Sequence, residues 1–205
     1  MTERISPRQF HEADGVEDGA PVTDPGEHSR LEPPFGTDEA ATLLGFLERQ
    51  RATFAWKCGG LDAVGLRATV GASSMTLGGM IKHLARFEDD MSTEWLHGRD
   101  QAPPWDTVDW DADHDWDWRT AAEDTPEQLY ALWRVAVARS RSLIAEALAD
   151  GSLERQETEI TDARGELPSL CYILINMIEE YARHNGHADL LRESVDGLVG
   201  QDPPC

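Results

Sequence analysis

Glu180 and His184 are ionisable side chains at positions where a helix would bury them. They are four residues apart in a segment whose apolar residues recur every three or four positions, which is the spacing of a buried helical seam. A buried carboxylate or imidazole needs a partner, and a divalent metal ion is one that both can share. Hydrogen bonds from Glu180 to His184 or His187, or an arginine from another helix, would satisfy the same groups. The spacing alone leaves these alternatives open.

His83 adds a third candidate ligand from a different helix. It borders the apolar stripe of a helix predicted at 76–97. A lone histidine on a helix is ordinarily half exposed or satisfied within the core, but two helices that each direct ionisable groups inward are less easily accidental. His83, Glu180 and His184 together predict a three-ligand metal site with open coordination positions, which is typical of catalytic rather than structural metals.

Four helical segments must position these residues. Their apolar periodicity and flanking turn residues predict helices at 38–58, 76–97, 126–149 and 167–195. Thr37 is the expected N-cap of the first helix, and Thr125 with Gln128 forms a capping-box pattern before the third. Four amphipathic helices with one long connection between the second and third predict an all-α four-helix bundle.

The charge of the chain excludes several classes of function. The formal net charge is −21 over 205 residues, which opposes binding to nucleic-acid phosphates or to an anionic membrane surface. No apolar stretch is long enough to span a bilayer, and no apolar leader follows the first arginines. The three cysteines show no paired spacing. We therefore expect a cytoplasmic protein without nucleic-acid or membrane partners.

The acidic residues are unevenly distributed along the chain. Residues 1–36, rich in acids, proline and glycine, predict a disordered or loosely packed arm, and residues 200–205 predict a frayed tail. The bundle is expected over residues 37–199. The second acidic segment is the connection at 101–118, which carries four tryptophans. These either anchor the connection on the bundle or form a lid over the metal pocket.

Two segments resemble the DinB-like superfamily of proteins. Residues 79–88 (GMIKHLARFE) are similar to the second helix of that superfamily, and residues 177–193 (MIEEYARHNGHADLLRE) are similar to its fourth. Gln50, Arg51 and Trp56 of the first predicted helix are also in keeping with it. The most similar branch is the actinobacterial mini-circle group, related to the metal-binding domain of mycothiol-dependent maleylpyruvate isomerase. The resemblance covers approximately the predicted bundle.

The resemblance implies a divalent metal, zinc first and nickel second, held by His83, Glu180 and His184. It also implies a metal-dependent enzyme, a mycothiol-dependent S-transferase or isomerase that acts on a small electrophilic molecule, as a possible homodimer. Relatives often carry histidine where Asn176 stands, so this chain departs from their pattern. His187, one turn after His184, is expected to support the site as a hydrogen-bond partner, although it is also an alternative ligand.

Two other functions use the same residues. One is a hydrolase that uses metal-activated water without a thiol, and the other is a non-catalytic bundle that binds a metal or small ligand in a stress response. Arg183 and Arg192 flank the site in sequence and could contact a thiol cofactor, although both are expected to point outward. Cys58 is expected to be a buried or rim thiol rather than a nucleophile.

Overall fold

The computed structural model describes residues 32–150, 152–154, 161 and 164–200, and its regular elements are all helical. Four helices are long: α1 (Glu39–Cys58), α3 (Leu77–Asp89), α5 (Pro126–Asp150) and α6 (Leu170–Asp196). The shorter elements are α2 (Ala63–Leu66), the π-helical η2 (Asp90–Trp95), the 3-10 turns η3 (Trp105–Thr107) and η4 (Ala121–Glu123), and α4 (Trp116–Thr120). The all-α prediction is confirmed. The predicted arm up to residue 31 and the tail from 201 lie outside the described residues.

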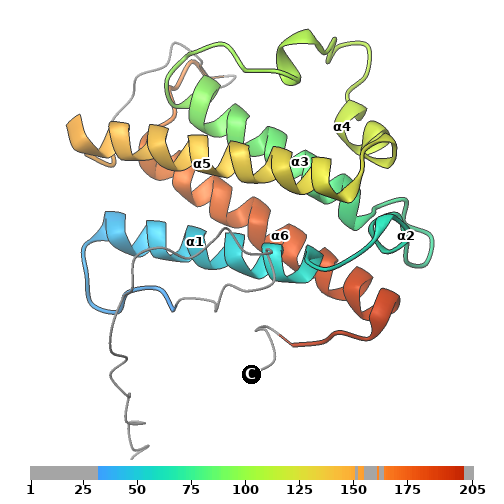
Figure 1. Ribbon diagram of the computed structural model, residues 1–205. Helices are drawn as coiled ribbons and strands as arrows, with labels where there is room; N and C mark the ends of the chain where they lie inside the picture. Colours follow the sequence, from blue (N-terminus) through green and yellow to red (C-terminus); the bar gives the residue numbers. More distant parts are fainter. Residues whose placement is uncertain (1–31, 151, 155–160, 162–163, 201–205) are drawn as a thin grey trace, which may run out of the picture.

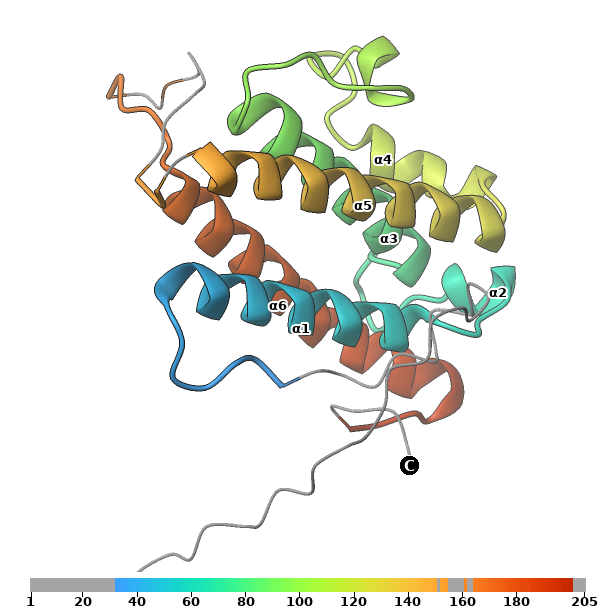
Figure 2. The same ribbon diagram turned by 60° about the vertical axis from the view of Figure 1, so that its left-hand side comes forward.

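The long helices pack as two neighbouring pairs. Helix α1 lies along α6, and α3 lies along α5, as both views show (Figures 1 and 2). Their inward faces supply a single apolar core, whose fully buried members include Leu47, Phe54, Leu77, Met80, Leu84, Ile173 and Met177. This core fixes α3 against α6, the two helices that carry the candidate ligands.

The helix boundaries follow local side-chain hydrogen bonds. Thr125 and Gln128 exchange two bonds at the start of α5, with Thr125 N donating at 2.8 Å and Gln128 N donating at 3.3 Å, so the predicted capping box is confirmed. The prediction of Thr37 as N-cap of α1 is wrong, because the carboxylate of Asp38 accepts from Ala41 N at 2.8 Å. Helix α6 begins three residues later than expected, since Ser169 caps it.

The helix predicted at 76–97 is not uniformly α-helical. After Asp89 the chain widens into the π-helical η2, where Leu96 N donates to Met91 O. The Ser92 hydroxyl donates to Glu88 O at 2.7 Å and so competes with the backbone N–H groups of the helix for this carbonyl. The apolar spacing of three and four residues cannot distinguish the two helix types, so the sequence did not reveal this change.

The connection between η2 and α5 is held on α3 by aromatic and ionic contacts. Trp105 is buried, and its Nε1 donates to Asp89 at 2.8 Å, as expected of an anchor. The Arg86 guanidinium lies 3.5 Å from the ring centre of Trp110, and Lys82 Nζ pairs with Asp124 at 2.6 Å. The acidic connection therefore lies against the basic side chains of α3, which places α4 over the bundle (Figure 1).

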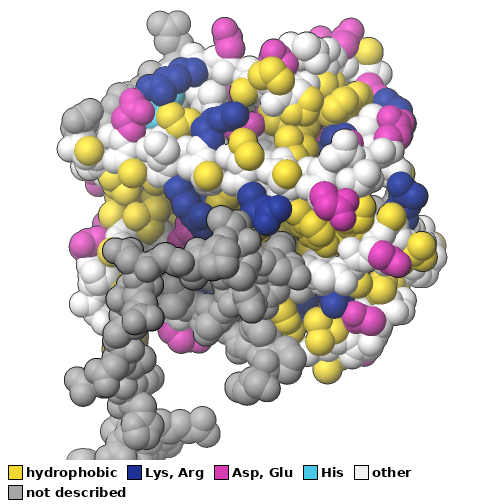
Figure 3. Space-filling view, viewed as in Figure 1, with side chains coloured by type: hydrophobic (Ala, Val, Ile, Leu, Met, Phe, Trp, Pro, Cys, Tyr) yellow, Lys and Arg dark blue, Asp and Glu magenta, His cyan; other side chains and the backbone are white. Residues whose placement is uncertain are grey.

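The visible surface carries intermixed charges. On the face drawn in Figure 3, acidic and basic side chains alternate with hydrophobic ones over the described residues, and neither sign forms a continuous field. Within the described ranges, no helix is both long and apolar enough to cross a membrane.

Candidate metal centre

The structure brings together His83, Glu180 and His184, the three residues proposed from the sequence. Glu180 Oε1 lies 3.2 Å from His83 Nε2 and 3.0 Å from His184 Nε2. One ligand atom from each residue falls within 4.8 Å of the other two. The group therefore has the compactness that a single ion requires of its ligands.

Helix geometry explains why these atoms meet. Glu180 and His184 are one turn apart on α6 and project from the same face, while His83 faces them from α3. The side chain of His184 is 5 % exposed, whereas those of His83 and Glu180 are 21 % and 26 % exposed. The group therefore lies at the edge of the core, where it is partly open to solvent.

His83 is held on its other side by Asp117 of α4. Asp117 Oδ2 lies 3.0 Å from His83 Nδ1, and because a carboxylate only accepts, Nδ1 carries the proton and donates. The acceptor for this ring nitrogen is therefore a carboxylate of the connection between η2 and α5, which the sequence analysis did not identify. Asp117 is almost fully buried, and a carboxylate behind a histidine in this way is the usual support of a metal-binding imidazole.

Trp118 covers the same histidine. Its ring stacks on that of His83 at a centroid distance of 4.8 Å and lies 5.7 Å from that of His184. Gly79 makes this possible, since a Cβ atom there would lie 2.7 Å from Cε3 of Trp118. Of the two roles considered for the tryptophans, Trp105 anchors the connection and Trp118 forms a wall of the site.

His187 contacts the group from the next turn of α6. Its Nδ1 lies 3.4 Å from Nδ1 of His184, and the two rings meet edge to face. It lies outside the compact group formed by His83, Glu180 and His184. This position suits a supporting contact to His184.

Positive charge shared by the imidazoles stabilises the carboxylates of the group. Hydrogen bonds from His184 and His83 hold the pKa of Glu180 well below its usual range. Burial disfavours a charged His83, but the bonds to Asp117 and Glu180 outweigh it and raise its pKa. With a carboxylate at each ring nitrogen, His83 is satisfied either as imidazolium or with a cation at Nε2. Two imidazoles and one carboxylate are a donor set that suits zinc or nickel.

Arg192 and Cys58, both considered in the sequence analysis, have structural rather than catalytic roles. Arg192 is buried, and its Nη1 donates to the carbonyls of Lys57 and Gly59, so it does not point outward as expected. Cys58 is fully buried, as expected, and burial raises the pKa of its thiol, which makes it a poor nucleophile.

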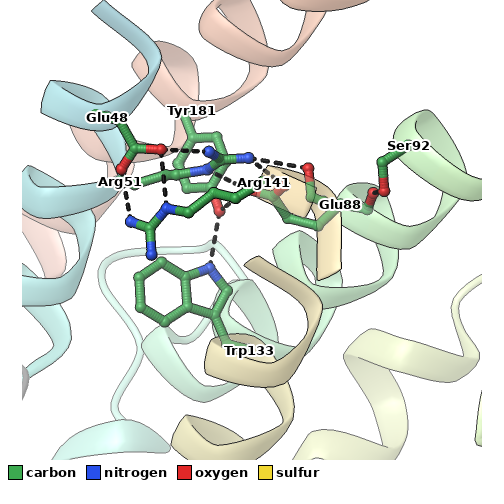
Figure 4. Close-up of polar contacts among 8 residues, drawn as sticks. Glu48, Arg51, Glu88, Ser92, Trp133, Arg141 and Tyr181 are labelled. Atoms are coloured by element: carbon green, nitrogen blue, oxygen red, sulfur yellow. Dashed lines mark hydrogen bonds and ion pairs between the residues drawn. The ribbon is translucent and has the colours of Figure 1, made fainter. Parts of the chain in front are cut away.

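One completely buried acid, Glu88, was missed by the sequence analysis. Glu88 is completely buried and pairs with Arg51 through two bonds of 2.7 and 2.5 Å, while Tyr181 donates to it at 2.7 Å (Figure 4). Trp133 completes the network by donating to Tyr181. Glu88 follows Leu84 by four positions, so its place on the apolar stripe was a signal for burial.

A helical bundle with a His–Glu–His group between its second and fourth long helices has the features of a DinB-like protein. The family model described as Mycothiol-S-transferase matches residues 42–197, a range that contains all three candidate ligands. The chain belongs to the mycothiol-S-transferase family, which confirms the DinB-like resemblance. Neither the curated proteins nor the solved structures gave a match to this chain.

Proposed function

We propose that this protein is a metal-dependent transferase that joins the sulfur of mycothiol to a small electrophilic molecule. The observation that carries the proposal is the convergence of His83 Nε2, Glu180 Oε1 and His184 Nε2 in a chain of the mycothiol-S-transferase family. Zinc is the proposed ion, with nickel as the second choice, and the cytoplasm is the proposed location.

The proposed reaction forms one bond and breaks two. The thiol loses its proton, and its sulfur forms a bond with an electrophilic carbon, from which the leaving group departs with the electron pair of its bond. A divalent ion held by His83, Glu180 and His184 would lower the pKa of a thiol beside it, so that the thiolate exists at neutral pH.

The residues of the chain have distinct roles in this proposal. As a ligand of the ion, Glu180 would stay anionic and offset part of the positive charge, and the thiol proton would pass to solvent. Asp117 fixes the ring of His83 by accepting from Nδ1, which leaves Nε2 for the ion. Trp118 excludes water from one side of the two histidines.

Metal analysis combined with a conjugation assay tests the proposal. The purified protein should contain close to one divalent ion per chain, and it should convert mycothiol and an electrophile such as monobromobimane into the thioether. Glu180→Gln should lose both the ion and the conjugation. Metal binding with hydrolysis but no thioether would favour the hydrolase alternative, and metal binding with neither reaction would favour a binding protein.

A further inference from the structure

Trp118 lines a cavity to which none of the three candidate ligands contributes. The cavity has a volume of ≈ 660 Å³ and is enclosed by α2, the start of α3, α4 and the start of α5. This volume is within the range of cavities that bind small organic molecules. Neither the family match nor the metal proposal assigns a role to it.

The floor of the cavity is apolar. Leu66, Ala121 and Leu129 line it and are almost completely buried, with exposed fractions of 2 %, 4 % and 2 %. Gly78 also lines it, and its lack of a side chain lets α3 approach α2 closely, since a Cβ there would lie 3.1 Å from Leu66 O. An apolar ligand would gain about 25 cal/mol for each Å² of surface that it buried on this floor.

Three of the four charged groups at the rim have partners within the chain, and the fourth, Asp115, is exposed. Asp124 pairs with Lys82, Arg119 pairs with Asp113, and Arg67 donates to the carbonyl of Ala122. Acidic and basic side chains both belong to this rim. A charged ligand would have to compete for groups that are already paired, so the rim favours an uncharged one.

Two of the three small hydroxyl residues of the rim accept local hydrogen bonds. Thr76 Oγ1 accepts from Gly79 N at 3.0 Å, and Ser73 Oγ accepts from Met75 N at 3.1 Å. These bonds stabilise the turn that leads into α3. The main apolar surface available to a ligand therefore belongs to the half-buried side chains above the floor, which are Met75, Trp118 and Pro126.

Trp118 connects the cavity with the metal centre. It lines the cavity, and the same ring stacks on His83 and lies beside His184. We propose that this cavity binds the apolar body of the uncharged electrophile, with its reactive carbon directed past Trp118 toward the histidines. This inference rests on the proposed function for its chemistry, but the binding site itself can be tested without it.

Direct binding of an uncharged, unreactive probe provides the first test. The probe is N-phenyl-1-naphthylamine, whose fluorescence increases in apolar surroundings. The variant Ala122→Phe places a large side chain at an exposed position of the cavity wall, and Ala131→Phe places the same side chain on an exposed part of α5 that does not line it. We expect Ala122→Phe to weaken probe binding by about tenfold or more and Ala131→Phe to leave it unchanged. Equal binding to wild type and Ala122→Phe would overturn the proposal.

Kinetics with the metal-loaded protein provide the second test. Ala122→Phe should raise KM for an apolar electrophile and leave KM for mycothiol and the metal content unchanged. The probe should compete with the electrophile. If the probe competed with mycothiol and not with the electrophile, the assignment of this cavity to the electrophile would be overturned. A protein without metal or transferase activity that still binds the probe in the cavity would refute the proposed function alone.

Discussion

Asp117 Oδ2 lies 3.0 Å from Nδ1 of His83, and Nε2 of the same ring lies 3.2 Å from Glu180 Oε1. The imidazole is thus held between a carboxylate from the connection and a carboxylate from α6. Asp117 accepts the hydrogen bond from Nδ1 and so orients the ring, and Nε2 of His83 then faces Glu180 and His184.

Removing the charge of Asp117 should weaken metal binding without removing a ligand. In Asp117→Asn the amide accepts less strongly from His83, so the affinity for zinc should fall by about 10–100-fold. Competition with a chromogenic chelator measures this affinity. Asp115→Asn is the matched control, since Asp115 is exposed two residues earlier, and it should bind as wild type does. An unchanged affinity in Asp117→Asn would show that the contact does not support the site.

Loss of a proposed ligand should remove the ion itself. His184→Ala should reduce bound metal to background in elemental analysis, because two ligands hold a divalent ion much less tightly than three. Wild type saturated at 100 times Kd should gain about 2.7 kcal/mol of stability from the ion, and His184→Ala should gain none. His114→Ala, at an exposed position of the connection, should retain the ion. Full metal content in His184→Ala would refute the ligand set.

Alanine should have opposite effects at two helical glycines. Gly186 of α6 has no atom near the position of a Cβ, so Gly186→Ala should stabilise the protein by up to about 1 kcal/mol. In Gly79→Ala the Cβ would meet Trp118 and push it from its place, so a loss of about 1–3 kcal/mol is expected instead. Urea unfolding measures both changes. A stabilising Gly79→Ala would mean that Trp118 moves aside freely.

The buried pair Arg51–Glu88 should be costly to break on one side only. Arg51→Met leaves the carboxylate of Glu88 unpaired in the core and should cost about 3–5 kcal/mol of unfolding free energy. The double variant Arg51→Met/Glu88→Leu removes both charges and should lose much less. Urea unfolding of both variants gives the comparison. If the double variant is as unstable as Arg51→Met, the packing of the arginine is what stabilises the bundle and not its charge.

Asp90 should make stability depend on pH. Burial raises its pKa from 3.8 to about 6, so the folded protein takes up a proton between these values that the unfolded chain does not. The contribution of Asp90 to stability therefore falls as pH rises from about 4 to 6, and Asp90→Asn should recover on the order of 2 kcal/mol at pH 7 and nothing below about pH 4. Thermal unfolding at several pH values measures this, with the exposed Asp100→Asn as control. A gain that is equal at pH 4 and pH 7 would exclude titration of Asp90 as its cause.

The sequence predicted the parts of the fold and site that depend on regular helices. Periodicity located the four long helices, and the spacing of Glu180 and His184 placed them on one face. Asp117 and Trp118 were not predicted as partners of His83, because they belong to a connection whose path has no periodicity to follow. Their positions depend on the packing of Trp118 against the backbone at Gly79.

Asp117 and Trp118 are consecutive residues of one short helix, yet one supports a metal ligand and the other lines a cavity. A ligand in the cavity that shifted this helix would move both residues, and binding at the two sites would then be coupled. Such coupling is reciprocal: whatever factor a ligand in the cavity contributes to ion affinity, the ion contributes to affinity for that ligand. A substitution that displaced α4 would then alter both the preferred electrophile and the retention of the ion, whereas one that left α4 in place would alter the preferred electrophile alone.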